Sequence, residues 1–166
     1  LATNHDDAKA MYEKYKSNQL GVISDVGFCE HRGGKPEEEK LDAGLNLVRH
    51  IKADDPKMPI LLQSSQDSIC PVAEELGVGF LRKYSKTLMI QLYDYIKEEF
   101  AFGDFIFRDA DRVEYGRAAN LKELEVLMRE IPEDILLANT SKNMLSKWFM
   151  ARGLFTLGAK FKKVSE

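Results

Sequence analysis

Apolar segments of strand length alternate with amphipathic segments of helix length over residues 1–102. The predicted strands lie at residues 20–24 (LGVIS), 58–65 (MPILLQSS) and 79–83 (GFLRK). Apolar residues at helical spacing predict four helices, at residues 6–17, 41–56, 71–76 and 86–100. This alternation is typical of an α/β fold with a parallel sheet. Since the strands show little polar alternation, we expect helices on both faces of that sheet.

The pattern changes after Phe102. Residues 104–118 (DFIFRDADRVEYGRA) predict two strands around a polar turn. Two helical segments follow, at 120–132 and 141–157, and Asn120 is a favoured residue for the start of the first. We therefore expect a small α+β appendage with the element order ββαα.

Composition limits the classes of function. We expect residues 1–102 and 103–166 to form separate units. The net charge of the chain is -3, which gives no basic surface for nucleic acid or anionic lipid. The longest apolar run is far shorter than a membrane span. Two cysteines, Cys29 and Cys70, are too few for a disulfide framework. Free thiols favour a reducing compartment, so we expect a cytoplasmic protein.

Chemically active side chains stand where the predicted strands end. The first strand leads to Asp25, the second to Ser64 and Ser65, and the third to Lys83. Because sites in open parallel sheets form at the carboxyl ends of strands, we expect these groups to share one rim. A carboxylate can attack phosphorus, a hydroxyl can bond one phosphoryl oxygen, and an ammonium can neutralise another. The sequence therefore predicts a phosphoryl site.

These segments resemble the receiver domain of bacterial response regulators. The segments LGVISDVGF, DAGLNLVRHIKADDPKMPILLQSS and AEELGVGFLRKYS are similar to its third to fifth strands with the intervening helices. The resemblance implies a flavodoxin-like fold and a partner that is a histidine kinase or phosphotransfer protein. It also implies Asp25 as the phospho-acceptor, Ser64 as the switch hydroxyl and Lys83 as the phosphate-sensing lysine, with Ser65 and Gly27 as secondary positions.

The sequence departs from the receiver pattern in several places. The resemblance implies Mg²⁺ held by Asp25 together with an acidic pair after the first strand, and that pair would lie upstream of Leu1. Compared with the receiver pattern, the sequence starts near the end of the second strand, so the inner edge of the strand at 20–25 is expected to be unpaired unless a segment upstream of Leu1, or another segment or chain, fills the gap. An insert at 31–40 lengthens the loop after Asp25, and Tyr84 replaces the usual proline.

The second half resembles the segment that follows a receiver-like domain in large bacterial proteins. Those proteins carry a catalytic region of the pyruvate phosphate dikinase or phosphoenolpyruvate synthase type downstream. The segments FGDFIFRD, RAANLKELEVLMREIPEDILL and SKWFMARGLF carry this likeness. The resemblance implies that the chain is a regulatory fragment acting on a downstream catalytic domain.

Two other functions stay open from the sequence. The same fold can serve as an unphosphorylated interaction module, with a homodimer surface on the helix at 86–100 that uses Leu88, Leu92, Tyr93 and Ile96. A phosphatase of the haloacid dehalogenase type also uses a strand-end aspartate, but it needs a general acid where Gly27 stands. Whether the chain is itself an enzyme is therefore left open.

Overall fold

The computed structural model describes residues 1–35, 39–40, 42–140 and 143–164. The chain divides into two compact units, Leu1–Tyr93 and Asp94–Glu166. The boundary falls inside helix α4 (Leu88–Glu99) rather than at the expected position after Phe102. The end of α4 contacts the segment that follows it, because the Lys97 carbonyl accepts a hydrogen bond from Gly103 N at 2.8 Å.

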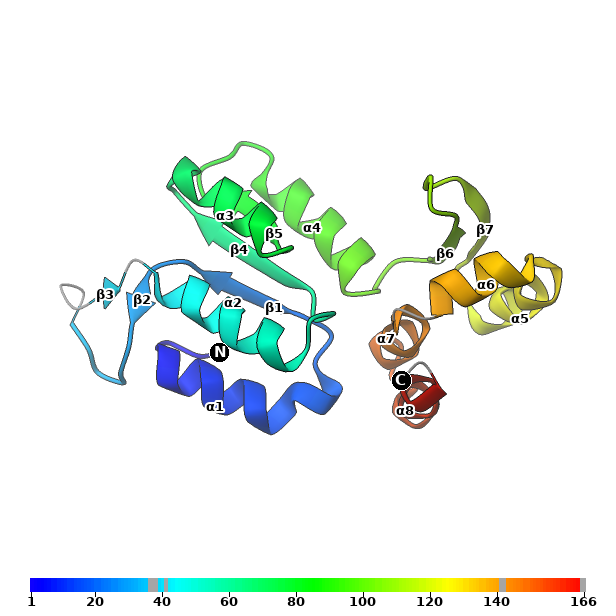
Figure 1. The fold of residues 1–166 in the computed structure, drawn as a ribbon, viewed down its shortest axis with the longest axis horizontal. Helices are drawn as coiled ribbons and strands as arrows, with labels where there is room; N and C mark the ends of the chain where they lie inside the picture. The colour runs from blue at the N-terminus through cyan, green and yellow to red at the C-terminus, as the bar shows by residue number, and fades with distance from the viewer. Residues whose placement is uncertain (36–38, 41, 141–142, 165–166) are drawn as a thin grey trace. The chain divides into compact units, whose positions relative to one another are not determined.

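A three-stranded parallel sheet forms the centre of the first unit (Figure 1). Its strands are β1 (Val22–Asp25), β4 (Ile60–Ser64) and β5 (Gly79–Arg82), in the order β1-β4-β5. All three form where the sequence predicts strands. The expectation of an α/β fold with a parallel sheet is therefore confirmed.

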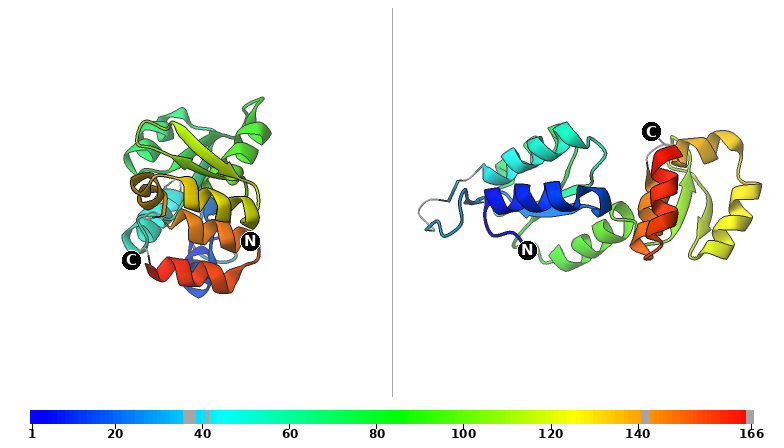
Figure 2. Two further views of the ribbon diagram at one scale, coloured as in Figure 1. Left: turned by 90° about the vertical axis from the view of Figure 1, so that its right-hand side faces the viewer. Right: turned by 90° about the horizontal axis from the view of Figure 1, so that it is seen from below.

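Helices cover both faces of this sheet. Helices α1 (His5–Tyr15), α2 (Ala43–Asp54) and α3 (Cys70–Glu75) supply the residues packed against one face. The start of α4 lies on the opposite side (Figure 2, right). Leu61 is buried on that second face, since its side chain alternates with those of its neighbours in β4.

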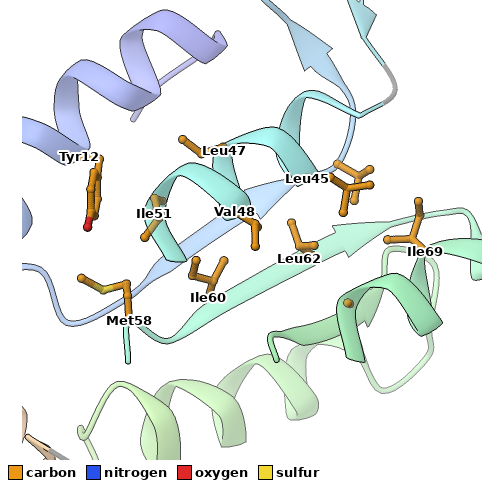
Figure 3. Close-up of a cluster of buried hydrophobic side chains, with 11 residues drawn as sticks. Tyr12, Leu45, Leu47, Val48, Ile51, Met58, Ile60, Leu62 and Ile69 are labelled. Atoms are coloured by element: carbon orange, nitrogen blue, oxygen red, sulfur yellow. The ribbon is translucent and has the colours of Figure 1, made fainter. Parts of the chain in front are cut away.

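One apolar cluster joins the sheet to α1, α2 and α3 (Figure 3). Its fully buried members include Val48 and Ile51 from α2 and Ile60 and Leu62 from β4. Burying each such side chain stabilises the fold by about 1.5–3 kcal/mol. Tyr12 extends the cluster to α1, and its hydroxyl donates to Asp54 Oδ2 at 2.8 Å. Burial, followed by the adjacent Asp54 carboxylate, raises the pKa of Tyr12.

The predicted polar insert carries local structure of its own. Strand β2 (Phe28–Cys29) pairs antiparallel with β3 (Glu39–Lys40), whereas the sequence predicts only a loop here. Residues 36–38 of the insert lie outside the described residues. An ion pair between Arg32 and Asp7 and a hydrogen bond from Asp6 N to the Glu30 carbonyl join the insert to α1. The composition of this segment does not predict these contacts.

The pairing of His31 with Asp6 makes this junction depend on pH. His31 Nδ1 lies 2.6 Å from Asp6 Oδ2, and that hydrogen bond raises the pKa of His31 and lowers the pKa of Asp6. For His31, the stabilisation is complete below its unfolded-state pKa and is lost as pH rises through the raised folded-state pKa. We expect Asp6→Asn to return the His31 pKa towards its ordinary value, measured by NMR titration of the ring. A His31 titration that Asp6→Asn leaves unchanged would contradict the contact.

Beyond the end of α4, the second unit contains a hairpin and four helices in its described residues. The hairpin pairs β6 (Phe105–Arg108) with β7 (Glu114–Ala118), as the sequence predicts. The helices are α5 (Leu121–Glu130), α6 (Glu133–Thr140), α7 (Met144–Ala151) and α8 (Phe155–Val164). The predicted order ββαα is therefore wrong.

Two local features account for the additional helices. Gly153 adopts a φ of 75°, which ends α7 and separates it from α8 within the single helix predicted at 141–157. Helix α6 directly follows Pro132, in a segment for which the sequence predicts no element. The side chain of Asn139 in α6 forms hydrogen bonds with both the N–H and the carbonyl of Arg108 in β6. Residues 141–142 of the predicted helix lie outside the described residues.

The prediction that Asn120 starts this helix is confirmed for α5. Asn120 Oδ1 accepts hydrogen bonds from the N–H groups of Lys122 and Glu123, both at 3.1 Å. Glu123 reaches back to Ala119 N at 2.8 Å rather than to the N–H of the cap residue itself. The start of α5 is thus satisfied by the residue types that the sequence indicates.

Candidate functional site

A carboxylate and an ammonium meet at the carboxyl end of the sheet. Asp25 is the last residue of β1, and Lys83 directly follows β5. Lys83 Nζ lies 3.1 Å from Asp25 Oδ2. The backbone fixes this placement, because Lys83 N donates to the Ser64 carbonyl at 3.0 Å. The structure therefore brings together two of the residues that the sequence places at one rim.

Solvent reaches both members of this pair. The side chain of Asp25 is 47% exposed and that of Lys83 is 37% exposed. A small phosphodonor therefore has access to the carboxylate oxygens of Asp25.

Ser64 points away from this pair. The register places Gln63 directly beside Asp25, and successive side chains alternate between the faces of a sheet. Ser64 therefore lies on the face of Ile60 and Leu62, where it is buried. Its hydroxyl accepts a hydrogen bond from Gln66 N at 3.1 Å. Of the three side chains expected to meet, Asp25 and Lys83 are in contact and Ser64 is not.

The two secondary positions, Ser65 and Gly27, lie just beyond the ends of β4 and β1. Ser65 follows the end of β4 and is exposed. Gly27 lies between β1 and β2 and carries no side chain that could act as an acid. The alternation that turns Ser64 away places Ser65 on the side of Gln63 and Asp25.

Gly44 positions Asp25 and is missed by the sequence reasoning. It lies in the first turn of α2, and its N–H donates to the Val26 carbonyl at 2.7 Å. A Cβ at this position would lie 2.8 Å from Val26 Cα and closer still to the Asp25 carbonyl oxygen. The helix thus approaches the end of β1 more closely than any side chain allows. A glycine inside a helical pattern is the signal that could have revealed this contact.

The described residues do not form a magnesium site. Within residues 1–35, 39–40, 42–140 and 143–164, no three histidine, cysteine, aspartate or glutamate side chains are grouped as metal ligands. Asp25 supplies one carboxylate at the rim, whereas Mg²⁺ sites take oxygen ligands in an octahedral arrangement. The residues present do not fit the expected ion, so no step of the chemistry below depends on it.

Removal of the Lys83 charge is expected to cost little stability. Partly exposed ion pairs contribute about 0–1 kcal/mol. We therefore expect Lys83→Met to change the free energy of unfolding by less than about 1 kcal/mol, measured by urea unfolding followed by circular dichroism. A larger loss would mean that the pair holds the sheet together rather than serving a reaction.

No family model, curated protein or solved structure matches this chain. Among the helices that the described residues form, none combines the length and the apolar character needed to cross a membrane. Function is therefore inferred from the geometry of the strand ends.

Proposed function

We propose that the chain is a receiver-like regulatory module that accepts a phosphoryl group on Asp25. The observation that carries this proposal is the 3.1 Å contact between Asp25 and Lys83 at the carboxyl ends of two parallel strands. In this proposal β1, β4 and β5 correspond to the last three strands of a flavodoxin-like sheet, whose ligands bind at the same ends.

The proposed reaction transfers phosphorus from a donor to a carboxylate. One oxygen of Asp25 attacks the phosphorus, and the bond from phosphorus to the leaving group of the donor breaks. The leaving group departs with the bonding electron pair, and Asp25 becomes an acyl phosphate. Lys83 then neutralises a phosphoryl oxygen in place of the Asp25 carboxylate oxygen that it now contacts.

A short turn connects Lys83 to the next helix. Ser85 N donates to the Arg82 carbonyl at 3.1 Å, and Thr87 N donates to Ser85 Oγ at 3.2 Å. Helix α4 begins at Leu88, immediately after this turn. A shift of Lys83 towards a phosphoryl group would therefore act on α4, with a usual coupling free energy of about 1–3 kcal/mol.

The proposed partners follow from the same scheme. A histidine kinase or phosphotransfer protein would supply the phosphoryl group. A downstream catalytic domain of the phosphoenolpyruvate synthase type would receive the signal through α4. Both cysteines are free thiols, which agrees with a cytoplasmic setting.

Intact mass after incubation with acetyl phosphate tests the proposal. We expect one phosphate adduct on the parent chain and none on Asp25→Asn. Asp67→Asn is the matched control, because Asp67 is also an exposed carboxylate in an ion pair. Its partner is Arg82, the last residue of β5, at 2.7 Å. An adduct that persists in Asp25→Asn, or no adduct on the parent, would refute the assignment.

An unphosphorylated interaction module is the second candidate, and the surface of α4 favours it. Met89 is 71% exposed and Ile90 is 63% exposed, and Tyr93 lies on the same face. Leu88 and Leu92, predicted for this surface, are half-buried on the other side of the helix. If this candidate holds, sedimentation should show a dimer that Met89→Lys with Ile90→Lys converts to monomer. Because Gly27 offers no acid, we do not propose phosphatase activity.

A further inference from the structure

Gln63 lies on the central strand of the sheet, between the strands that carry Asp25 and Lys83 (Figure 1). The register pairs Asp25 of β1 with Gln63 of β4, and Gln63 with Leu81 of β5. Paired residues of a sheet project to the same face, and so do residues two apart along one strand. Because Lys83 follows Leu81 by two residues, the side chains of Asp25, Gln63 and Lys83 share one face of the sheet.

Gln63 is the first polar residue along β4, and packing does not explain it. The three residues before it, Ile60, Leu61 and Leu62, are at most 1% exposed. Gln63 itself is half-buried, and its carboxamide forms no hydrogen bond with the part of the chain that the structure describes. An apolar side chain here would bury more surface against Leu81 and stabilise the sheet further. The amide therefore suits the chemistry at the strand ends better than it suits the core.

A phosphoryl group on Asp25 needs more than one partner. During transfer, negative charge is spread over the three outer oxygens of the group. Lys83 acts as a point charge and neutralises one of them. Ser64, the hydroxyl expected to bind another, lies on the opposite face and accepts from Gln66 N. The carboxamide of Gln63 carries two N–H donors and lies on the face of Asp25.

We propose that the Gln63 carboxamide donates a hydrogen bond to the phosphoryl group as it is transferred to Asp25, in the role that the sequence assigns to the Ser64 hydroxyl. This inference rests on the proposed phosphorylation of Asp25 and adds a binding residue to that site. An oxygen of Asp25 forms the new bond to phosphorus. With acetyl phosphate as donor, the bond from phosphorus to the acetate oxygen breaks and its electron pair leaves with acetate. The amide transfers no proton and stabilises the charge on the phosphoryl oxygens.

Two other donors near the strand ends fit this role less well. Ser65 lies on the same side as Gln63 by alternation, but it follows the last paired residue of β4, so the ladder does not fix its position. Arg82 pairs in register with Ser64 and therefore lies on the opposite face. Its guanidinium is already in an ion pair with Asp67 at 2.7 Å.

The rate of adduct formation from acetyl phosphate, followed by intact mass, tests the role of Gln63. Gln63→Met keeps the length of the side chain and removes both N–H donors. We expect it to slow adduct formation by about tenfold, which is less than the usual loss of about 10²–10³-fold for such a donor, because the site is partly exposed. Gln91→Met is the matched control, since Gln91 is exposed in α4, and it should keep the parent rate. Ser64→Ala should also stay close to the parent rate.

The side-chain amide signals of Gln63 in NMR spectra give a second measurement, made on the parent chain itself. Incubation with acetyl phosphate should shift the two N–H signals of Gln63, because they move next to a phosphoryl group. The corresponding signals of Gln91 should not move. Asp25→Asn should abolish both the adduct and the shift. This measurement holds even if Gln63→Met fails to fold, which circular dichroism would reveal.

The outcomes separate this inference from the function on which it rests. Equal rates for the parent and Gln63→Met, without a shift of the Gln63 amide, would overturn the role of Gln63 and leave the phosphorylation of Asp25 intact. Slower formation in Ser64→Ala or Ser65→Ala, but not in Gln63→Met, would assign the donor to that serine instead. No adduct on the parent chain would refute the proposed function and this inference together.

Discussion

Replacing Gly44 with alanine is expected to destabilise the first unit by about 2–3 kcal/mol, at the upper end of the usual cost of overpacking. The added methyl group would overlap the Asp25 carbonyl oxygen and lie 2.8 Å from Val26 Cα. Both obstacles are backbone atoms, so no side-chain rotation relieves the overlap. The hydrogen bond from Gly44 N to the Val26 carbonyl would lengthen as α2 moves away.

The sign of this effect is opposite to the ordinary one. Alanine in place of a helical glycine usually stabilises a helix by about 1 kcal/mol. At Gly44 the steric overlap and the weakened hydrogen bond outweigh that gain. The end of β1 must shift, so we expect the contact between Asp25 and Lys83 to open as well.

Urea unfolding followed by far-ultraviolet circular dichroism measures the loss. Asn46→Ala is the matched control, because Asn46 lies exposed in the same helix and its replacement should change stability by less than about 0.5 kcal/mol. Trp148 is the single tryptophan and belongs to the second unit, so its fluorescence follows that unit separately. Equal or greater stability of Gly44→Ala would show that α2 does not approach β1 this closely.

The sequence was sufficient for the parallel sheet and for part of the site. Short apolar runs bounded by glycine and proline located β1, β4 and β5, because buried strands need little else. The rule that parallel strands end on one rim then placed Asp25 beside Lys83. Both steps depend on local patterns that the sequence contains.

The orientation of Ser64 could not be obtained in the same way. It depends on register, since Asp25 lies beside Gln63 and a shift of one residue would turn Ser64 to the other face. Register is fixed by the packing of β4 against α2, which is a tertiary property. The contact of Gly44 with β1 has the same origin, because helical spacing does not show how closely a helix approaches a strand.

The second unit shows a different limit. Leu145, Trp148, Phe149 and Phe155 share one predicted helical face, yet Phe155 is 60% exposed while the other three are buried. The turn at Gly153 changes the chain direction and moves Phe155 out of phase with the rest. Helical periodicity therefore identifies the core residues of α7, but the helix it predicts extends beyond Ala151, where α7 ends.

Replacing Trp148 with alanine is expected to destabilise the second unit by about 3–5 kcal/mol. The indole is buried against Phe105 and Phe149, with ring centroids 6.0 and 5.7 Å away. Its Nε1 donates to the Gly103 carbonyl at 3.0 Å. The Arg152 guanidinium lies 3.6 Å from the ring centroid and donates to the same carbonyl at 2.9 Å. Removal of the indole therefore opens a cavity and uncovers a partly buried cation.

The position of Arg152 places the expected loss towards the upper end of that range. Burial lowers the pKa of Arg152, and the ring and the carbonyl groups around the guanidinium replace part of the water that it has lost. We expect Trp148→Phe to retain part of the stability, because a smaller ring still covers the guanidinium without donating to Gly103. Phe155→Ala is the control, and since Phe155 is mainly exposed it should cost less than about 0.5 kcal/mol. Urea unfolding followed by circular dichroism ranks the three variants, and similar losses for Trp148→Ala and Phe155→Ala would disprove this account of the core.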